Sequence, residues 1–241
     1  MKDQDPYSQF LVSRRQVLAW AGMTGVILIM NGIRNPAQAT PHSLCIVRPE
    51  QTEGPYFVDE RLHRMDIRSE PSNGTLVVGT PFTLTFQVSR MHAGACHPLP
   101  DAQVDIWHCD ARGVYSDVQD PGFDTSGQKF LRGYQLTDAQ GTARFNTIYP
   151  GWYPIRTVHI HFKIRTAPVA RRRYEFTSQV YFPDDLTDHV HTTLPYSSNG
   201  RRRVRNHNDF LFRDGGNRLM LEPSEMNDGY TATFPIALII S

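Results

Sequence analysis

Residues 151–164, GWYPIRTVHIHFKI, contain the pattern from which the fold and chemistry of this chain can be inferred. The stretch Val158–Ile164 alternates in the manner of a β-strand. Successive side chains of a strand point to opposite faces, so His159 and His161 project together while Ile160 turns away. Two neutral imidazoles on one face are natural metal ligands. On their own, the same two histidines could also be satisfied within a polar cleft.

Further short segments of this kind surround the histidine strand. The clearest are Pro81–Ser89, Ala102–His108, Arg132–Leu136, Ala143–Thr147, Glu175–Phe182 and Thr231–Ile240. The turn formers Thr137–Gly141 are expected to join Arg132–Leu136 and Ala143–Thr147 into a hairpin. Few stretches have helical spacing. Many short strands between Gly, Pro and Asp residues predict an all-β fold, a single-domain antiparallel β-sandwich with long loops that form a cleft.

The first 39 residues are predicted to lie outside this fold. Arg14 and Arg15 precede the apolar run Ala19–Met30, and Ala37–Ala39 supplies small residues for cleavage. The run is shorter than the ~20 residues that span a bilayer. Paired arginines favour a twin-arginine-type signal peptide over residues 1–39; the alternative is an amphipathic or anchor helix. We expect an exported protein, periplasmic or extracellular, with no stable membrane span after processing.

The predicted mature chain, residues 40–241, is almost neutral. Residues 1–39 contain four of the 25 basic and two of the 24 acidic residues, which leaves the remainder with a net charge of −1. This balance gives no electrostatic reason to bind nucleic acid.

Three cysteines remain: Cys45, Cys96 and Cys109. In an exported protein, one disulfide and one free thiol are expected. Cys96 and Cys109 flank the predicted strand Ala102–His108, which is about 23 Å long, and a disulfide needs Cα atoms within about 7 Å. Cys45 is therefore expected to be one partner, and the other partner is left open.

Two tyrosines can reach the histidine strand. Tyr153 precedes His159 by six residues across a segment rich in turn formers, so its phenol can bend back over the strand, and Arg156 lies between them. The strand Ala102–His108 is followed by a Gly-containing turn and Tyr115, which can deliver a second phenol. Either tyrosine alone would more often be a core or rim aromatic; their grouping makes them candidate ligands.

Two other features admit a structural interpretation. A second His-x-His pair, His189 and His191, lies in a loop-like stretch without an arranged phenol and is expected to be structural or on the surface. The basic clusters Arg171–Arg173 and Arg201–Arg203 fall between strands. They are either solvated loops or groups that attract an anionic substrate to the cleft.

Three segments resemble the intradiol ring-cleavage dioxygenases, the family that contains protocatechuate 3,4-dioxygenase and catechol 1,2-dioxygenase. They are TEGPYF (52–57), VDIWHCDARGVYS (104–116) and residues 133–164. The resemblance implies non-haem ferric iron, Fe(3+), held by two tyrosines and two histidines: Tyr115, Tyr153, His159 and His161. It also implies that Arg156 and Gln179 are active-site residues and that Tyr56 lines the substrate cleft.

The chemistry of this donor set agrees with the resemblance. Ferric iron favours anionic oxygen donors, and a bound cation can deprotonate a phenol whose free pKa is ~10. Ferrous oxygenases typically use two histidines and a carboxylate, a pattern that no acid completes beside His159 and His161.

The implied reaction starts when a catechol chelates the iron and displaces Tyr153. Both atoms of O2 are inserted, and the ring opens between the hydroxylated carbons to a muconate-type diacid. Arg156 would stabilise negative charge on the ring, and Gln179 would orient the substrate.

The chain departs from the best-known members in three ways. These are its predicted export, a shorter spacing between Tyr153 and His159 than in the protocatechuate enzymes, and no room for the N-terminal helical dimerisation region of catechol 1,2-dioxygenases. The identity of the catechol and the formation of a homo-oligomer are therefore left open.

Two other classes of protein could use the same features. One is a copper or zinc metalloenzyme that binds through His159 and His161. The other is a β-sandwich binding module for polysaccharide or aromatic ligands that lacks turnover. The metalloenzyme would lack the red-brown colour of ferric tyrosinate, and the retention of all four candidate ligands and Arg156 argues against the binding module.

Overall fold

The structure is a computed structural model that describes residues 45–166 and 174–240. The predicted signal peptide and the cluster Arg171–Arg173 lie outside the described residues. The strands are β1 (Pro81–His92), β2 (Ala95–Pro98), β3 (Gln103–Trp107), β4 (Gln119–Asp120), β5 (Phe123–Asp124), β6 (Arg132–Leu136), β7 (Thr142–Ile148), β8 (His159–Arg165), β9 (Glu175–Tyr181), β10 (Ser224–Met226) and β11 (Gly229–Ile239). The helices are α1 (Asp184–Val190) and three short 3-10 segments, Tyr196–Asn199, Asn206–Asn208 and Gly216–Leu219. Among the described residues, no helix is both long enough and apolar enough to cross a lipid bilayer.

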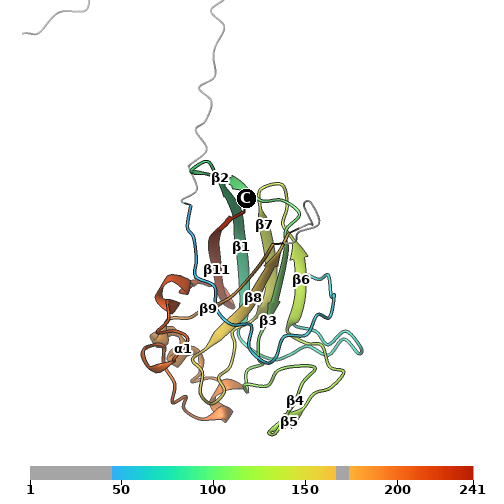
Figure 1. The fold of residues 1–241 in the computed structure, drawn as a ribbon. Coiled ribbons are helices and arrows are strands. Elements are labelled where there is room, and N and C mark those ends of the chain that lie inside the picture. Colours follow the sequence, from blue (N-terminus) through green and yellow to red (C-terminus); the bar gives the residue numbers. More distant parts are fainter. Residues whose placement is uncertain (1–44, 167–173, 241) are drawn as a thin grey trace, which may run out of the picture. The chain divides into compact units, whose positions relative to one another are not determined.

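Most strands belong to two sheets (Figure 1). One sheet has the order β10-β11-β1-β2, with β7 also paired to β1, and the other has the order β6-β3-β8-β9. Strands β4 and β5 form a separate two-stranded hairpin. The predicted all-β sandwich is confirmed, and its antiparallel character holds for every described ladder except one: β1 and β11 run parallel. Parallel pairing needs a long connection, and here the whole chain from β2 to β10 lies between the two strands.

The turn at Thr137–Gly141 differs from the prediction. The N–H of Gly141 donates to Asp138 O at 2.8 Å, so the turn itself is formed. However, β6 pairs with β3 and β7 pairs with β1, so the turn passes between the two sheets and the hairpin prediction is wrong. Gly141 is docked on β1, since its carbonyl accepts the N–H of Val88 at 2.7 Å. A Cβ at this glycine would lie 2.2 Å from Val88 O.

The core lies between the two sheets. On β1, Phe82, Leu84, Phe86 and Val88 are buried at alternate positions. Phe86 packs against Phe162 of β8, with ring centroids 5.1 Å apart. Burying one such side chain contributes about 1.5–3 kcal/mol relative to leaving it exposed.

Strand β8 is buried on both faces. Because Phe162 faces the core, the odd-numbered residues face outward. That outer face is covered by the chain after Cys45, which runs along β9: the N–H of Gln51 donates to Thr177 O at 3.0 Å, and Ser178 Oγ donates to Pro49 O at 2.8 Å. We call residues 45–60 the strap.

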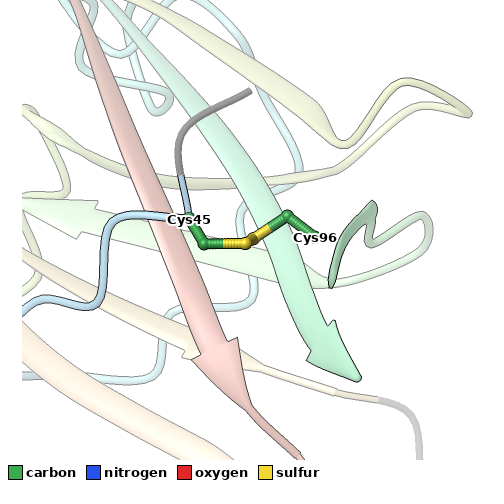
Figure 2. Close-up of a disulfide and its surroundings, with 2 residues drawn as sticks. All are labelled: Cys45 and Cys96. Carbon is green, nitrogen blue, oxygen red and sulfur yellow. A yellow bond between two sulfur atoms is a disulfide. The ribbon is translucent and has the colours of Figure 1, made fainter. Parts of the chain in front are cut away.

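The strap is anchored by the disulfide Cys45–Cys96, whose Cα atoms are 5.5 Å apart (Figure 2). This confirms that Cys45 is one partner and assigns Cys96, on β2, as the other. Cys109 is a buried free thiol. Because the bond closes a loop across 51 residues, it restricts the unfolded chain and stabilises the fold by about 4 kcal/mol on the chain-entropy estimate.

Candidate metal centre

Four predicted ligand side chains meet on the outer face of β8. The phenol oxygens of Tyr115 and Tyr153 lie 3.5 Å and 3.2 Å from Nε2 of His159. Nε2 of His159 lies 3.0 Å from Nε2 of His161. Nε2 of His159 is therefore close to three other potential ligand atoms, and the four side chains come from three separate segments of the chain.

The pairing of β8 with its neighbours fixes the two imidazoles. His161 lies opposite Trp107 on β3 and opposite Gln179 on β9. The indole of Trp107 stacks on the His161 ring, with centroids 5.0 Å apart and planes 6° apart. On the strap, Gly54 has φ +74°, and a Cβ there would lie 3.3 Å from His161 Cε1. Glycine suits this position because it adopts a positive φ readily and has no Cβ to crowd the His161 ring.

The two phenols are positioned by loops that pack against each other. Tyr115 follows β3 through a turn in which the Asp110 carboxylate accepts two backbone N–H groups, at 2.8 and 2.9 Å. Gly113, in this turn, has φ +86°, and a Cβ there would lie 2.3 Å from Trp152 O. This close approach brings Tyr153, the next residue, beside Tyr115, with ring centroids 5.7 Å apart.

The hydrogen bonds of His159 determine which nitrogen faces the centre. Its Nδ1 lies 2.6 Å from Thr157 O, and a carbonyl only accepts, so Nδ1 carries the proton. The lone pair of Nε2 is then directed toward the other three candidate ligand atoms. Burial, together with the nearby charge of Arg156, lowers the pKa of both His159 and His161 well below the usual value. Both imidazoles are therefore neutral, as metal ligation requires.

The pKa values of the two phenols shift upward, in the opposite direction to those of the histidines. Burial raises the pKa of Tyr115 well above its usual value, and burial likewise raises the pKa of Tyr153. Without a nearby cation both phenols stay protonated, whereas a bound metal ion reverses this preference. The described residues contain no group of three or more His, Cys, Asp and Glu side chains that could hold a metal. Two phenols with two imidazoles fit a hard trivalent cation, because they supply two negative charges without a carboxylate.

Arg156 and Gln179 lie beside the four candidate ligand side chains and are hydrogen-bonded to each other. Nη2 of Arg156 donates to Gln179 Oε1 at 2.6 Å, and Gln179 Nε2 donates to Thr52 O on the strap at 3.1 Å. Nε of Arg156 donates to Asp209 Oδ2 at 2.8 Å, and the same oxygen accepts the N–H of Thr157 at 2.8 Å. Asp209 is fully buried. Its role is not apparent from the sequence, because it lies 53 residues from Arg156 and belongs to no recognised motif.

Tyr56 lies over Tyr115, with ring centroids 4.5 Å apart and planes 28° apart. Its hydroxyl donates to Asp120 Oδ2 at 2.7 Å. Burial and this carboxylate raise the pKa of Tyr56 to about 12, so its phenol stays protonated. The prediction that Tyr56 belongs to the site segment therefore agrees with its position.

A second residue missed from sequence, Arg132, connects the strap to the Tyr115 loop. Its guanidinium donates to Tyr56 O at 2.7 Å and to Ser116 O at 3.1 Å. Burial lowers the pKa of Arg132 to about 10, and the side chain still carries its charge at neutral pH.

The second His-x-His pair was predicted to be structural or on the surface; it lies at the end of α1, where His189 is exposed and His191 makes structural contacts. Nε2 of His191 lies 3.0 Å from Pro150 O, and its ring stacks on Tyr196 with centroids 5.0 Å apart. In the cluster Arg201–Arg203, Arg202 pairs with Asp184 and Asp188, so this arginine stabilises the loop after α1.

Comparison with known proteins agrees with the fold. Residues 52–209 match the protein family described as Dioxygenase. Catechol 1,2-dioxygenase of Acinetobacter baylyi is 33% identical over 114 residues, which cover 44% of this chain and 32% of the relative. Hydroxyquinol 1,2-dioxygenase of Corynebacterium glutamicum is 34% identical over 136 residues, covering 49% and 41%. The matched segments thus span one-third to two-fifths of these relatives.

A solved structure of an intradiol ring-cleavage dioxygenase from Tetranychus urticae matches over more of its length. It has a TM-score of 0.70 and 28% identity, and the match covers 81% of this chain and 95% of that one. The chain therefore belongs to the intradiol ring-cleavage dioxygenase family, as its sequence motifs predicted.

Proposed function

We propose that this protein is a non-haem ferric dioxygenase that inserts both atoms of O2 into a catechol. The ring would open between its two hydroxylated carbons to give a muconate-type diacid. The observation that carries the proposal is that two phenol oxygens and Nε2 of His161 all lie within 3.0–3.5 Å of Nε2 of His159 in a buried site. Membership of the family supports the same reaction class.

Tyr115, Tyr153, His159 and His161 would hold the metal. When bound, ferric iron would accept the two catechol oxygens and make the ring reactive toward dioxygen. Tyr115 is buried, whereas Tyr153 is only partly buried and lies in a loop. Tyr153 is therefore the ligand that can move aside, and its phenolate oxygen would take up a proton as the catechol binds.

Arg156 would supply positive charge beside the reacting ring. Its guanidinium is 7% exposed and is held by Asp209 and Gln179, so it needs no reorganisation to stabilise developing negative charge. Gln179 is fully buried and binds Arg156 through its Oε1. We infer that Gln179 positions the arginine and, through it, orients the substrate.

We also propose that the protein acts outside the cytoplasm. The disulfide Cys45–Cys96 supports this location because such bonds persist in oxidising compartments. Fractionation of cells that express the full chain should find the protein in the periplasm or medium. Retention of most of the protein in the cytoplasm would contradict the proposal.

The reaction is tested with the iron-loaded protein, catechol and 18O-labelled O2. Wild type should consume one O2 per ring opened and incorporate both labelled atoms into the diacid. Tyr153→Phe and His161→Ala should lose at least about 100-fold in turnover, as expected when one preorganised electrostatic or acid–base group is removed. Tyr230→Phe, on β11 in the other sheet, is the matched control and should keep wild-type turnover. Full activity with zinc or copper in place of iron would overturn the proposal.

A further inference from the structure

We propose that Ile155 and Phe210 form an apolar rim beside Arg156 that selects catechols with an apolar alkyl or aryl substituent over catechols with a carboxylate. This inference rests on the proposed function and adds the substrate class. We call these two residues the rim.

Ile155 combines exposure with an unfavourable backbone conformation. Its side chain is 72% exposed, and its φ is +72°. A β-branched residue rarely occupies this left-handed region, which glycine or asparagine adopts far more readily. Neither its exposure nor its conformation favours isoleucine for stability. Such strain is typical of ligand-binding positions, and Ile155 lies between the candidate ligand Tyr153 and Arg156.

Phe210 is held against Arg156. Its ring is 60% exposed, and its centroid lies 5.7 Å from the Cζ atom of Arg156. The preceding residue, Asp209, accepts hydrogen bonds from both Arg156 and Thr157 through one carboxylate oxygen. This fixes the segment that carries Phe210 against the segment that carries Ile155. Two large, exposed apolar side chains therefore flank the active-site arginine.

The charged groups around the site do not favour a substrate carboxylate. Recognition of a carboxylate uses two parallel N–H donors of an arginine, but Arg156 already donates from Nε to Asp209 and from Nη2 to Gln179. On the same face of β8, Lys163 pairs with Glu53, and Arg165 pairs with Asp59 and Asp105. These cations are neutralised within the protein.

The hydroxyl of Tyr56 donates to the Asp120 carboxylate, so the charge at this hydroxyl is negative. The nearby cation, Arg132, is buried and already donates to Tyr56 O and Ser116 O. A substituent on the catechol ring would therefore meet apolar side chains at the rim and a like charge near Tyr56. An alkyl group would gain from burying apolar surface, whereas a carboxylate would lose hydration without a bidentate contact from Arg156, whose Nε and Nη2 already have acceptors.

The test compares kcat/KM of the iron-loaded protein for 4-tert-butylcatechol, catechol and protocatechuate. Wild type should prefer 4-tert-butylcatechol to protocatechuate by at least about 10-fold. In each of the variants Ile155→Asn and Phe210→Ala, the ratio of kcat/KM for 4-tert-butylcatechol to kcat/KM for catechol should fall about 10-fold. This is the effect expected when an apolar contact of this size is lost. The loss should appear mainly in KM. Met226→Ala removes an exposed apolar side chain on β10 and should leave the ratio unchanged.

A second measurement separates the rim from a structural role. Ile155→Asn should have a melting temperature at or above that of wild type, since asparagine tolerates the left-handed conformation. The same variant should bind 4-tert-butylcatechol about 10-fold more weakly in anaerobic equilibrium dialysis. Equal selectivity and affinity in wild type and both rim variants would overturn the inference, as would a preference for protocatechuate.

The experiments distinguish failure of the proposed function from failure of the rim inference. If no catechol is opened by iron-loaded wild type, the proposed function fails, and the dialysis measurement still decides whether the rim binds the alkyl group. If catechol is opened but the rim variants behave as wild type, only the rim inference fails.

Discussion

The two faces of β8 are both buried but are stabilised in different ways. On the inner face, Ile160, Phe162 and Ile164 are fully buried in the apolar core between the sheets. On the outer face, His159 and His161 place their Nε2 atoms 3.0 Å apart, while Lys163 and Arg165 are neutralised by carboxylates. The inner face is held by apolar packing, whereas the outer face is held by hydrogen bonds and ion pairs between polar side chains.

Removing core packing should have the largest effect on folding. Phe162→Ala should lower the free energy of unfolding by about 3–5 kcal/mol, because it deletes a ring packed against Phe86 and Phe234. Urea denaturation of the metal-free protein measures this. His161→Ala, one position away on the other face, is the comparison and should destabilise the metal-free protein much less. Equal losses would show that the two faces do not differ as described.

Breaking the buried ion pair beside the site should be the next largest effect. Asp209→Asn leaves the charge of Arg156 without its carboxylate and should cost about 3 kcal/mol of stability. Turnover should fall as well, since the same oxygen holds Arg156 and Thr157. Denaturation and kcat are measured on the same samples. A variant with unchanged stability and kcat would contradict a positioning role for Asp209.

A third buried histidine, His108, differs from the imidazole pair because both of its ring nitrogens have protein partners. These are Cys109 O at 2.8 Å and Thr147 Oγ1 at 2.6 Å. Burial lowers the pKa of His108 to about 4, from about 6.5 in the unfolded chain. As pH falls from 6.5 to 4, the unfolded state gains a proton that the folded state does not. Stability should therefore be lost in this window, by up to about 3 kcal/mol.

The measurement is the free energy of unfolding of the metal-loaded protein against pH, for wild type and His108→Gln. Glutamine retains an acceptor for Thr147 but does not titrate, so the variant's curve should be flatter between pH 6.5 and 4. Parallel curves would show that His108 does not account for this part of the acid sensitivity.

The smallest effect is expected where the outer face meets solvent. Glu53→Gln removes the partner of Lys163, but Glu53 is partly exposed and solvent screens the pair. The loss should be below about 1 kcal/mol and should shrink in high salt. Thermal unfolding at low and high ionic strength checks this. A loss as large as that of Phe162→Ala would mean that the ion pairs dominate the stability of this face.

The sequence predicted the parts of this molecule that depend on local alternation. All seven predicted strands are present, with ends shifted by at most a few residues, and the shared face of His159 and His161 follows from their spacing. Short strands such as β2 and β10 carry too few residues for an alternating pattern.

What the sequence could not predict depends on contacts between distant segments. The parallel partnership of β1 with β11 and the passage of the Thr137–Gly141 turn between sheets are set by packing across the whole domain. Asp209 and Arg132 act on the site through hydrogen bonds to segments 53 and 76 residues away. Neither residue has a local pattern that indicates its partner.

The most direct test of the central claim is titration of metal-free protein with ferric iron, followed by visible absorption. The account predicts one iron per chain and a red-brown absorption band. The band should weaken in Tyr115→Phe and in Tyr153→Phe and disappear in the double variant, while Tyr230→Phe keeps it in full. A band of unchanged strength in the double variant would contradict the claim that these two phenols and the histidine pair hold one metal ion.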